Sequence, residues 1–434
     1  MALEKERLMA YFQEHYLSRQ EVLYKLPLSL SIDAFWPELL NRRKATAAVL
    51  PLYNAAGMPY WYVQTQRMVH ASEQLCEAAM AQADGFDPYR AQMTSAMTEE
   101  MFFTSFVEGA QIPLQEAMDF LQRGTEPENI QEQMIWNNRC AWQAMISALY
   151  LPLDEPFVRS LAWALTQEMD NAAEDYRQTD SHPIAAMSDE RYSVPSAISL
   201  PDRMREYYDF LRDGGVHPLI KSAVGQAYIL VVRPFPEGNE RLARMISSAV
   251  LLRSGYDLFR DISISGVIAR ENYRYYKAMR EILRGENGGD LTYFVEYYLE
   301  LLARALEEKK TRERHREEEA LEQERRMARE PLQSAPTEMR VPSAMTPDEL
   351  LAVDDSIIDA DTEDAGKGDD GPEEKAVPVE TPGPRRRHQP PWPLCSQEEF
   401  LEKVDALKDS PYERCREYPE HIRAMLSHGM TTFT

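Results

Sequence analysis

The residues with the clearest chemical potential lie in one short segment, where two arginines follow a glycine. Arg241 and Arg244 are three apart, so both lie on one face of a helix that begins just after Gly238. Backbone N–H groups at a helix amino terminus carry partial positive charge, and guanidinium groups add full charges that suit phosphate oxygens. Glu237 precedes them and offers the hard oxygen ligand that Mg²⁺ prefers. The segment therefore favours a phosphate-binding site, although arginines that only form surface ion pairs would give the same pattern.

The surrounding sequence predicts a helix, a loop and a second helix. Pro234 and Pro236 prevent the first helix from continuing, and Gly238 permits an unusual backbone angle. Asn239 is a favoured N-cap for the second helix. That helix has apolar residues at helical spacing, namely Leu242, Met245, Ile246 and Val250.

This segment resembles the signature of the Fic (Fido) family, which reads His-Pro-Phe-x-(Asp/Glu)-Gly-Asn-Gly-Arg-x-x-Arg. The matching residues are Pro234, Phe235, Glu237, Gly238, Asn239, Arg241 and Arg244. Two positions depart from the signature: Arg233 stands at the family's His, and Glu240 stands at its second Gly. The flanking residues 217–223 and 251–256 are also similar to the family, and the resemblance extends over about residues 97–305.

The resemblance implies a Fic-like helical bundle that uses ATP and Mg²⁺. It assigns Gly238, Asn239, Glu240, Arg241 and Arg244 to the nucleotide, Glu237 to the metal, and the catalytic position to Arg233. The usual reaction of the family is AMPylation, the attachment of AMP from ATP to a hydroxyl of a target protein.

A second resemblance lies far upstream, at residues 104–109. Thr104, Glu108 and Gly109 are similar to the inhibitory-helix motif of the family, (Ser/Thr)-x-x-x-Glu-(Gly/Asn). In the family this Glu pairs with the second signature Arg and keeps the γ-phosphate of ATP from its productive position. The resemblance thus implies a pair between Glu108 and Arg244, which suits a guanidinium fork. By itself, a Glu followed by Gly is also typical of a plain helix end.

The segment from Gln178 to Leu200 interrupts the helical pattern. Pro183 and Pro195 exclude a continuous helix, and the residues before Pro195 have strand character. By its order along the chain, a hairpin at about residues 184–194 resembles the family's flap, a strand edge that docks the backbone of a target protein. An ordinary surface loop is the alternative.

Arg233 cannot perform the role of the signature His. A guanidinium has no lone pair to accept a hydroxyl proton, so general-base assistance worth about 10²- to 10⁴-fold in rate is lost. Glu240 places a negative charge beside the phosphate site, which weakens anion binding. The nearest histidines, His182 and His217, are expected in a loop and at a helix start rather than as a substitute base.

Two functions of different classes remain open. The first is a Fic-type nucleotidyl or phosphoryl transferase acting on a protein hydroxyl, with usual AMPylation impaired or lost. The second is a catalytically silent Fic scaffold that binds a nucleotide or a protein partner. Sequence alone leaves the target protein and the oligomeric state open.

The apolar pattern from residue 1 to residue 306 has helical period, so we expect an all-α fold. The expected domains are a helical subdomain at 1–96, a Fic-like core at 97–305 with the inhibitory helix at 97–110, a charged helix at 306–330, a disordered acidic linker at 331–395 and a short helical element at 396–434. A frayed tail is the alternative for the last of these. Trp36, Tyr60, Trp61 and Tyr62 are expected in the core of the first domain, and an aromatic binding surface is the alternative.

Bulk composition limits the kinds of partner that we expect this protein to bind and the compartment in which we expect it. A formal net charge of −24 and a sequence pI near 4.9 argue against nucleic acid and anionic membrane surfaces. The four cysteines lack the spacing of a zinc site or a disulfide framework, which indicates a reducing compartment. The amino terminus does not resemble a signal peptide, and no segment is apolar enough to span a bilayer. We therefore expect a cytoplasmic protein.

Overall fold

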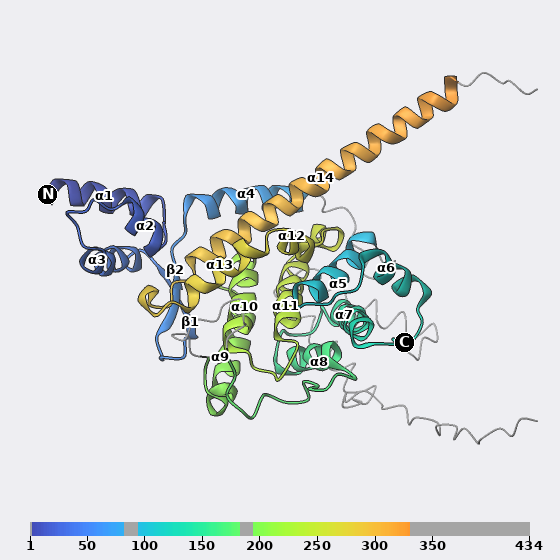
Figure 1. Ribbon diagram of the computed structural model, residues 1–434, viewed down its shortest axis with the longest axis horizontal. Coiled ribbons are helices and arrows are strands. Elements are labelled where there is room, and N and C mark those ends of the chain that lie inside the picture. The colour runs from blue at the N-terminus through green and yellow to red at the C-terminus, as the bar shows by residue number, and fades with distance from the viewer. Residues whose placement is uncertain (1, 82–93, 183–193, 330–434) are drawn as a thin grey trace, which may run out of the picture. The chain divides into compact units, whose positions relative to one another are not determined.

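The computed structural model describes residues 2–81, 94–182 and 194–329 of the 434-residue chain (Figure 1). The expected linker at 331–395, the element at 396–434 and nearly all of the expected flap lie outside the described residues. Residues up to His315 form one compact unit, and the end of the last helix belongs to a second unit.

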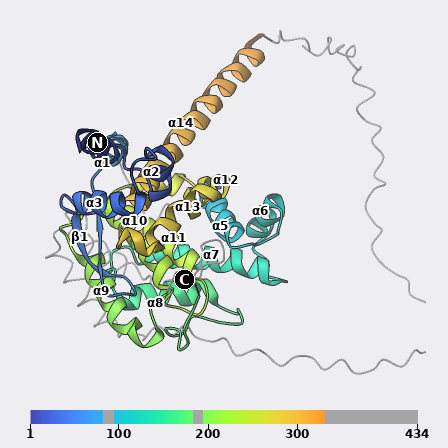
Figure 2. The same cartoon turned by 60° about the vertical axis from the view of Figure 1, so that its left-hand side comes forward.

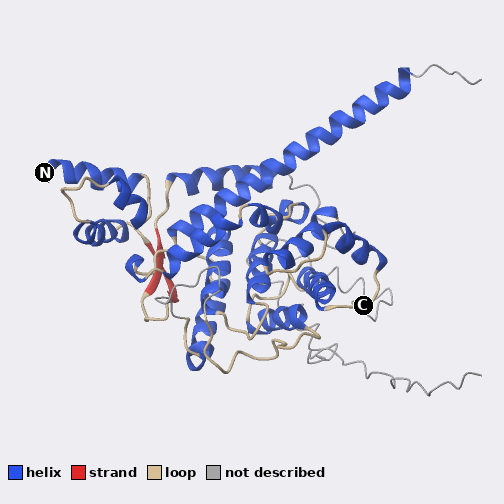
Figure 3. Cartoon of the chain, viewed as in Figure 1, coloured by secondary structure: helices blue, strands red, loops and turns tan. Residues whose placement is uncertain are grey.

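Helices dominate the described residues, as the periodicity predicted (Figure 3). Those before the signature segment are α1 (Ala2–Glu14), α2 (Arg19–Lys25), α3 (Ile32–Lys44), α4 (Gln66–Ala81), α5 (Ser95–Val107), α6 (Leu114–Arg123), α7 (Ile130–Ser147), α8 (Glu155–Thr166), α9 (Leu200–Arg212) and α10 (Pro218–Val232). Those after it are α11 (Asn239–Arg253), α12 (Ile264–Arg270), α13 (Asn272–Leu283) and α14 (Thr292–Arg329). Short 3₁₀ turns lie at Ala197–Ser199, Asp257–Asp261 and Gly285–Asn287. The all-α class is thus confirmed.

Several helix boundaries follow from local chemistry. The Asp154 side chain accepts a hydrogen bond from the Phe157 amide and caps α8, with a proline in the first turn. His217 caps α10 in the same way through Nδ1, which accepts from the Leu219 amide at 3.3 Å. These caps fix where the two helices around the site begin.

The centre of the fold is the pair α10 and α11, which lie side by side (Figure 1). Nearly every residue of both helices is buried. Tyr298 of α14 inserts its hydroxyl between Ser222 of α10 and Ser247 of α11, whose own hydroxyls are 2.7 Å apart. The two helices that flank the loop are therefore joined by buried hydroxyl groups as well as by apolar packing.

Three further helices, α5, α7 and α8, contact α11 around its start. α7 contacts α5, α8 and α11, and α6 packs against both α5 and α7. The two views agree on this arrangement (Figure 2). Helix α5 thereby brings residues about 140 positions upstream beside the signature segment.

The described residues contain one two-stranded sheet, which the sequence analysis did not predict. β1 (Ala48–Tyr53) pairs antiparallel with β2 (Pro59–Tyr62), and Val49 lies opposite Trp61. The side chain of Asn54 accepts hydrogen bonds from two amides in the connecting turn, and Gly57 has φ +76° there. Trp61 is fully buried, as expected, but it lies in a strand of the subdomain that was expected to be helical.

Helix α14 is continuous across the boundary that we expected near residue 306. Its first half is buried up to Leu306, and residues 312–323 are exposed. Among the described residues, no helix combines the length and the apolar character needed to cross a bilayer.

Candidate functional site

The loop between α10 and α11 has a left-handed residue at each end. Helix α10 ends at Arg233, whose φ is +48°, and α11 begins after Gly238, whose φ is +76°. A Cβ at residue 238 would lie 2.8 Å from Cγ2 of Thr166 on α8. Both the backbone conformation and this close approach require glycine at this position.

Asn239 does not cap α11, so the prediction of an Asn239 N-cap was wrong. Gly238 occupies the N-cap position, and no side chain caps the helix. The Asn239 amide instead turns back to the loop: Oδ1 accepts from the Phe235 amide at 3.0 Å, and Nδ2 donates to the Phe235 carbonyl at 2.8 Å. The first N–H groups of α11 thus remain free of a side-chain cap and suit an anion.

Arg241 and Arg244 are buried and share one carboxylate partner. Nε of Arg241 donates to Glu108 Oε2 at 2.9 Å, and Nη2 of Arg244 donates to Glu108 Oε1 at 3.1 Å. The pair between Glu108 and Arg244 that the resemblance implies is therefore present, and Arg241 is an additional partner. Arg241 also donates through Nη1 to the Leu165 carbonyl at the end of α8, at 2.7 Å.

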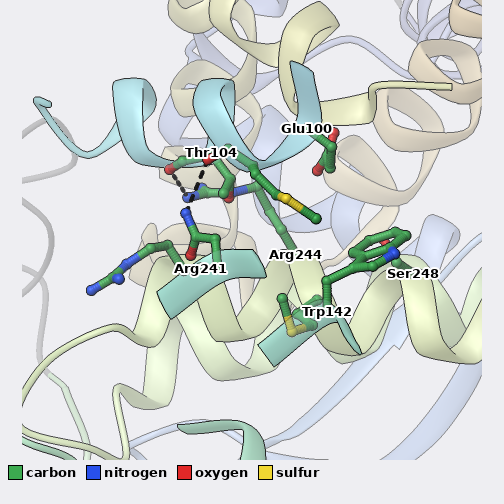
Figure 4. Close-up of a pocket in the computed structure, with 9 residues that line it drawn as sticks. Glu100, Thr104, Trp142, Arg241, Arg244 and Ser248 are labelled. Atoms are coloured by element: carbon green, nitrogen blue, oxygen red, sulfur yellow. Dashed lines mark hydrogen bonds between the residues drawn. The ribbon is translucent and has the colours of Figure 1, made fainter. Parts of the chain in front are cut away.

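Thr104 holds the other side of Arg244 (Figure 4). Its hydroxyl accepts from Nε of Arg244 at 2.7 Å, and its carbonyl accepts from Nη2 at 2.8 Å. Glu108 is the C-cap of α5, and Gly109 follows it with φ +100°, which ends the helix there. All three residues of the inhibitory-helix motif therefore contribute to the geometry around the arginine.

The charges of this site are largely balanced internally. Burial alone would lower the pKa of Arg244, but the carboxylates of Glu108 and Glu240 hold it above its ordinary value. Glu108 is mostly buried, with 13% of its side chain exposed, so solvent screens these ion pairs little. An incoming phosphate would have to compete with Glu108 for the same guanidinium groups.

The two residues that depart from the signature contact each other. Nη1 of Arg233 is 3.4 Å from Oε1 of Glu240, and the two side chains are 19% and 15% exposed. Burial raises the pKa of Glu240, and the negative charge of Glu108 raises it further, whereas Arg244 and Arg233 oppose the shift. Arg233 is thus already paired with a carboxylate at the position of the signature His.

Helix α13 contributes two tyrosines that the sequence analysis missed. The Tyr275 hydroxyl accepts from Nε2 of Gln226 at 3.0 Å. Burial is the main cause that raises the pKa of Tyr276, and the negative charge of Glu240 adds to it. Both tyrosines are buried within the field of the charged cluster. Only their helical spacing beside apolar residues was visible in the sequence, and that is equally typical of core.

A small cavity lies beside Arg244, between α5, α7 and α11 (Figure 4). Three of the lining residues, Arg244, Trp142 and Asn138, each have one buried atom (Nη1, Nε1 and Oδ1) without a hydrogen-bond partner in the described part of the chain. Glu100, also in the lining, accepts from the Ser265 amide at 2.8 Å, yet burial still raises its pKa. The inner side of Arg244 therefore faces a small cavity whose lining includes apolar side chains, Met101 and Met245 among them, beside these few polar groups.

The remaining candidate residues lie apart from this cluster. Glu237 is half-buried in the loop and makes no hydrogen bond or ion pair with the described residues. Within the described ranges, no group of three or more His, Cys, Asp or Glu is arranged to hold a metal ion. His217 is a helix cap whose pKa burial lowers, and His182 is exposed.

Fold and site together define a helical protein in which a buried helix begins without a side-chain cap and carries two arginines that pair with the Glu108 carboxylate. Residues 152–251 match the family model described as Fic/DOC family. The resemblance to the Fic family is thereby confirmed for this segment. The match includes Arg233, Glu240 and both signature arginines.

A curated relative and several solved structures are similar to this chain, among them the following. A probable protein adenylyltransferase, aq_aa38 of Aquifex aeolicus (strain VF5), is 27% identical over 116 residues, which is 26% of this chain and about a third (32%) of that relative. A Fic family protein from Desulfovibrio desulfuricans G20 has 19% identity and a TM-score of 0.48, covering 58% of this chain and 76% of its own. Fic-1 from C. elegans (residues 134 to 508 of that protein) has 18% identity and a TM-score of 0.44, covering 57% and 72%.

Proposed function

We propose that this protein binds a nucleotide at the start of α11 and that its usual AMP transfer is impaired or lost. The observation that carries the proposal is the pair between Arg233 and Glu240 at the position of the signature His. A guanidinium stays protonated at physiological pH and cannot accept the proton of a target hydroxyl. The described residues near the loop offer no histidine in its place, because His217 caps the far end of α10.

The retained donors support a nucleotide site. The uncapped start of α11 and the guanidinium groups of Arg241 and Arg244 are suited to the phosphates of ATP. The curated relative named as a probable protein adenylyltransferase makes ATP the nucleotide to test. The carboxylate of Glu237 is free to meet a Mg²⁺ ion that arrives with the phosphates, which is how such ions usually bind.

We further propose that Glu108 inhibits this site. Its carboxylate neutralises Arg241 and Arg244 together, so a phosphate must displace two buried ion pairs before it reaches either arginine. A target protein would dock through the segment at about residues 184–194.

Calorimetric titration of Mg²⁺ and ATP into the full chain tests the proposal. We expect weak binding to the wild type, binding that is about 10- to 100-fold tighter in Glu108→Gly, and loss of binding in Arg244→Ala. Glu126→Gln removes one charge from an exposed residue remote from the cluster and serves as the control. Thermal unfolding of each variant shows whether the change in charge has damaged the fold.

The alternative is a catalytically silent scaffold, which the mutual neutralisation of Arg233 and Glu240 favours. No heat in the wild type or in Glu108→Gly would contradict the nucleotide site and leave this alternative. If Glu108→Gly does bind ATP, transfer of a labelled AMP group to protein hydroxyls is compared in Glu108→Gly, with and without Arg233→His and Glu240→Gly. Transfer that requires these two reversions would show that catalysis was lost through them.

A further inference from the structure

Arg177 is a buried arginine whose guanidinium joins three separate stretches of backbone. Its Nε donates to the carbonyl of Arg233 at 2.8 Å, and its Nη1 donates to the carbonyl of Thr179 at 2.8 Å. Its Nη2 donates to the carbonyl of Pro195 and, at 3.4 Å, to that of Val232. Only 4% of the side chain is exposed, so these contacts are shielded from water.

Two of these carbonyls belong to the chain segments that flank residues 183–193. We call residues 177–181 the entry stem and residues 194–197 the exit stem. Thr179 lies in the entry stem and Pro195 in the exit stem, so one guanidinium binds both.

The backbone reinforces the same arrangement. The Arg177 amide donates to the carbonyl of Pro234 at 2.9 Å. This bond attaches the entry stem to the loop between α10 and α11, which we call the signature loop. The Ala197 amide donates to Oδ1 of Asp180 at 2.9 Å, which connects the exit stem to the entry stem. These two amides therefore report on the alignment of the stems with the loop.

The chemistry of the contact requires an arginine. Val232 and Arg233 lie at the carboxyl end of α10, where carbonyls without helical partners carry partial negative charge that a cation stabilises. The acceptors point toward Arg177 from three directions, which suits the planar fork of a guanidinium and not the single ammonium of lysine. Asp180 is 3.9 Å from Nη1, so backbone carbonyls rather than a carboxylate are the hydrogen-bond partners.

We propose that Arg177 is a positioning residue that holds the entry and exit stems at a fixed place beside the turn at Arg233. The inference rests on the proposed function, because the entry stem contacts the loop at Arg233 and Pro234, to which a target hydroxyl would have to be brought. Arg177 itself contacts neither Glu108 nor the two arginines of the phosphate site.

Amide hydrogen exchange on the full chain tests this role in Arg177→Gln and Arg177→Lys. In Arg177→Gln, we expect the amides of residue 177 and Ala197 to exchange at least about 10-fold faster. The reason is that the guanidinium hydrogen bonds that hold the neighbouring backbone carbonyls are lost. Arg177→Lys should restore only part of the protection. Arg253→Lys is the control. Arg253 lies at the carboxyl end of α11, far from the stems, and it also donates to backbone carbonyls, those of Leu149 and Leu151.

The outcomes separate a local role from general stability. Faster exchange confined to the stems in the Arg177 variants, with the Leu242 amide of α11 unchanged, supports the proposal. Equal acceleration throughout α11 would reduce Arg177 to a general stabilising residue, and unchanged stem amides would overturn the proposal. Full protection in Arg177→Lys would show that positive charge suffices without the fork, which also contradicts it.

A parallel titration with Mg²⁺ and ATP keeps the two proposals separate. We expect the nucleotide affinity of Arg177→Lys to stay within about 3-fold of the wild type, because Arg177 lies outside the phosphate site. If the wild type does not bind ATP, the proposed function fails while the exchange result still decides the role of Arg177.

Discussion

At the scale of single residues, Arg233 and Glu240 are best understood together. Each introduces a charge that the family signature lacks, and in the structure the two charges face each other in a partly buried place. A partly buried charge is costly without a partner, so either replacement alone would destabilise the loop. Arg233 also adopts a left-handed backbone conformation, which costs a non-glycine residue about 1 kcal/mol. These two departures therefore compensate each other in charge.

Glu240→Gln should strengthen the binding of Mg²⁺ and ATP by about 10-fold in the Glu108→Gly background. The change removes a negative charge beside the phosphate site and leaves Arg233 free to reach an anion. Calorimetry measures the affinity, and Glu126→Gln in the same background controls for the change in net charge. An affinity that is unchanged or weaker would show that Glu240 does not oppose nucleotide binding.

At the scale of elements, the site depends on the contact between the end of α8 and the start of α11. Thr166 donates its hydroxyl to the carbonyl of Ala162 at 2.9 Å and accepts from the Ala173 amide at 2.7 Å, so its methyl group is fixed. That methyl group faces Gly238. Next to it, the Leu165 carbonyl accepts a hydrogen bond from Arg241. The end of α8 therefore constrains both the backbone at Gly238 and the side chain of Arg241 in the candidate site.

Gly238→Ala should lower the free energy of unfolding by about 2 to 4 kcal/mol. Part of the loss comes from the left-handed backbone and part from the close approach of the new Cβ to Thr166 Cγ2. Thr166→Ser removes that methyl group while keeping the hydroxyl, so the double variant should recover the steric part. Denaturant unfolding of the four proteins gives the coupling energy. If the two changes are additive, the contact with Thr166 is not the cause.

At the scale of the whole unit, a buried polar junction joins α1–α3 to the start of α14. Helices α1–α3 have a small hydrophobic core of their own around Phe12 and Phe35. The fully buried Arg43 donates to the Phe12 carbonyl at 2.7 Å and to the Tyr293 hydroxyl at 2.7 Å. Close by, the Tyr16 hydroxyl donates to Oδ2 of Asp290 at 2.8 Å. The attachment of the amino-terminal helices thus relies on buried polar groups.

The stability of this junction should depend on pH. Burial raises the pKa of Asp290 to about 6, above its ordinary value of 3.8. Between these values the folded state binds more protons than the unfolded state, so this contribution to stability is lost as the pH rises from about 4 to 6. The loss amounts to at most about 3 kcal/mol. The free energy of unfolding of Asp290→Asn minus that of the wild type should therefore be larger at pH 7 than at pH 4.

Denaturant unfolding at both pH values measures this double difference. The single side-chain oxygen of Asn can still accept from the Thr292 amide, which donates to Oδ1 of Asp290 at 2.9 Å, whereas Oδ2, the acceptor of the Tyr16 hydroxyl, is replaced by an NH2 group. Asp202→Asn, at a residue whose side chain is 77% exposed, is the matched control and should show no such difference. A difference between Asp290→Asn and the wild type that is equal at pH 4 and pH 7 would contradict the role of Asp290.

The sequence by itself determined the class of the fold and predicted residues that the structure brings together at the candidate site. Helical periodicity and local caps, such as Asp154, are encoded within a few residues, so they can be recognised without tertiary information. The resemblance also related Glu108 to Arg244, residues 136 positions apart, because the two motifs are each short and specific. The strands β1 and β2 were missed because the aromatic residues of β2 are equally typical of a helical core.

Only the tertiary structure decided how the site residues divide their contacts. It shows that Arg241 shares Glu108, that Asn239 turns back to the loop, and that Arg233 pairs with Glu240. It also brings Arg177 against the end of α10. Each of these contacts depends on the approach of different elements or on the direction of a side chain within a loop. Such choices are made by packing across the whole unit, and residue types along a local segment do not specify them.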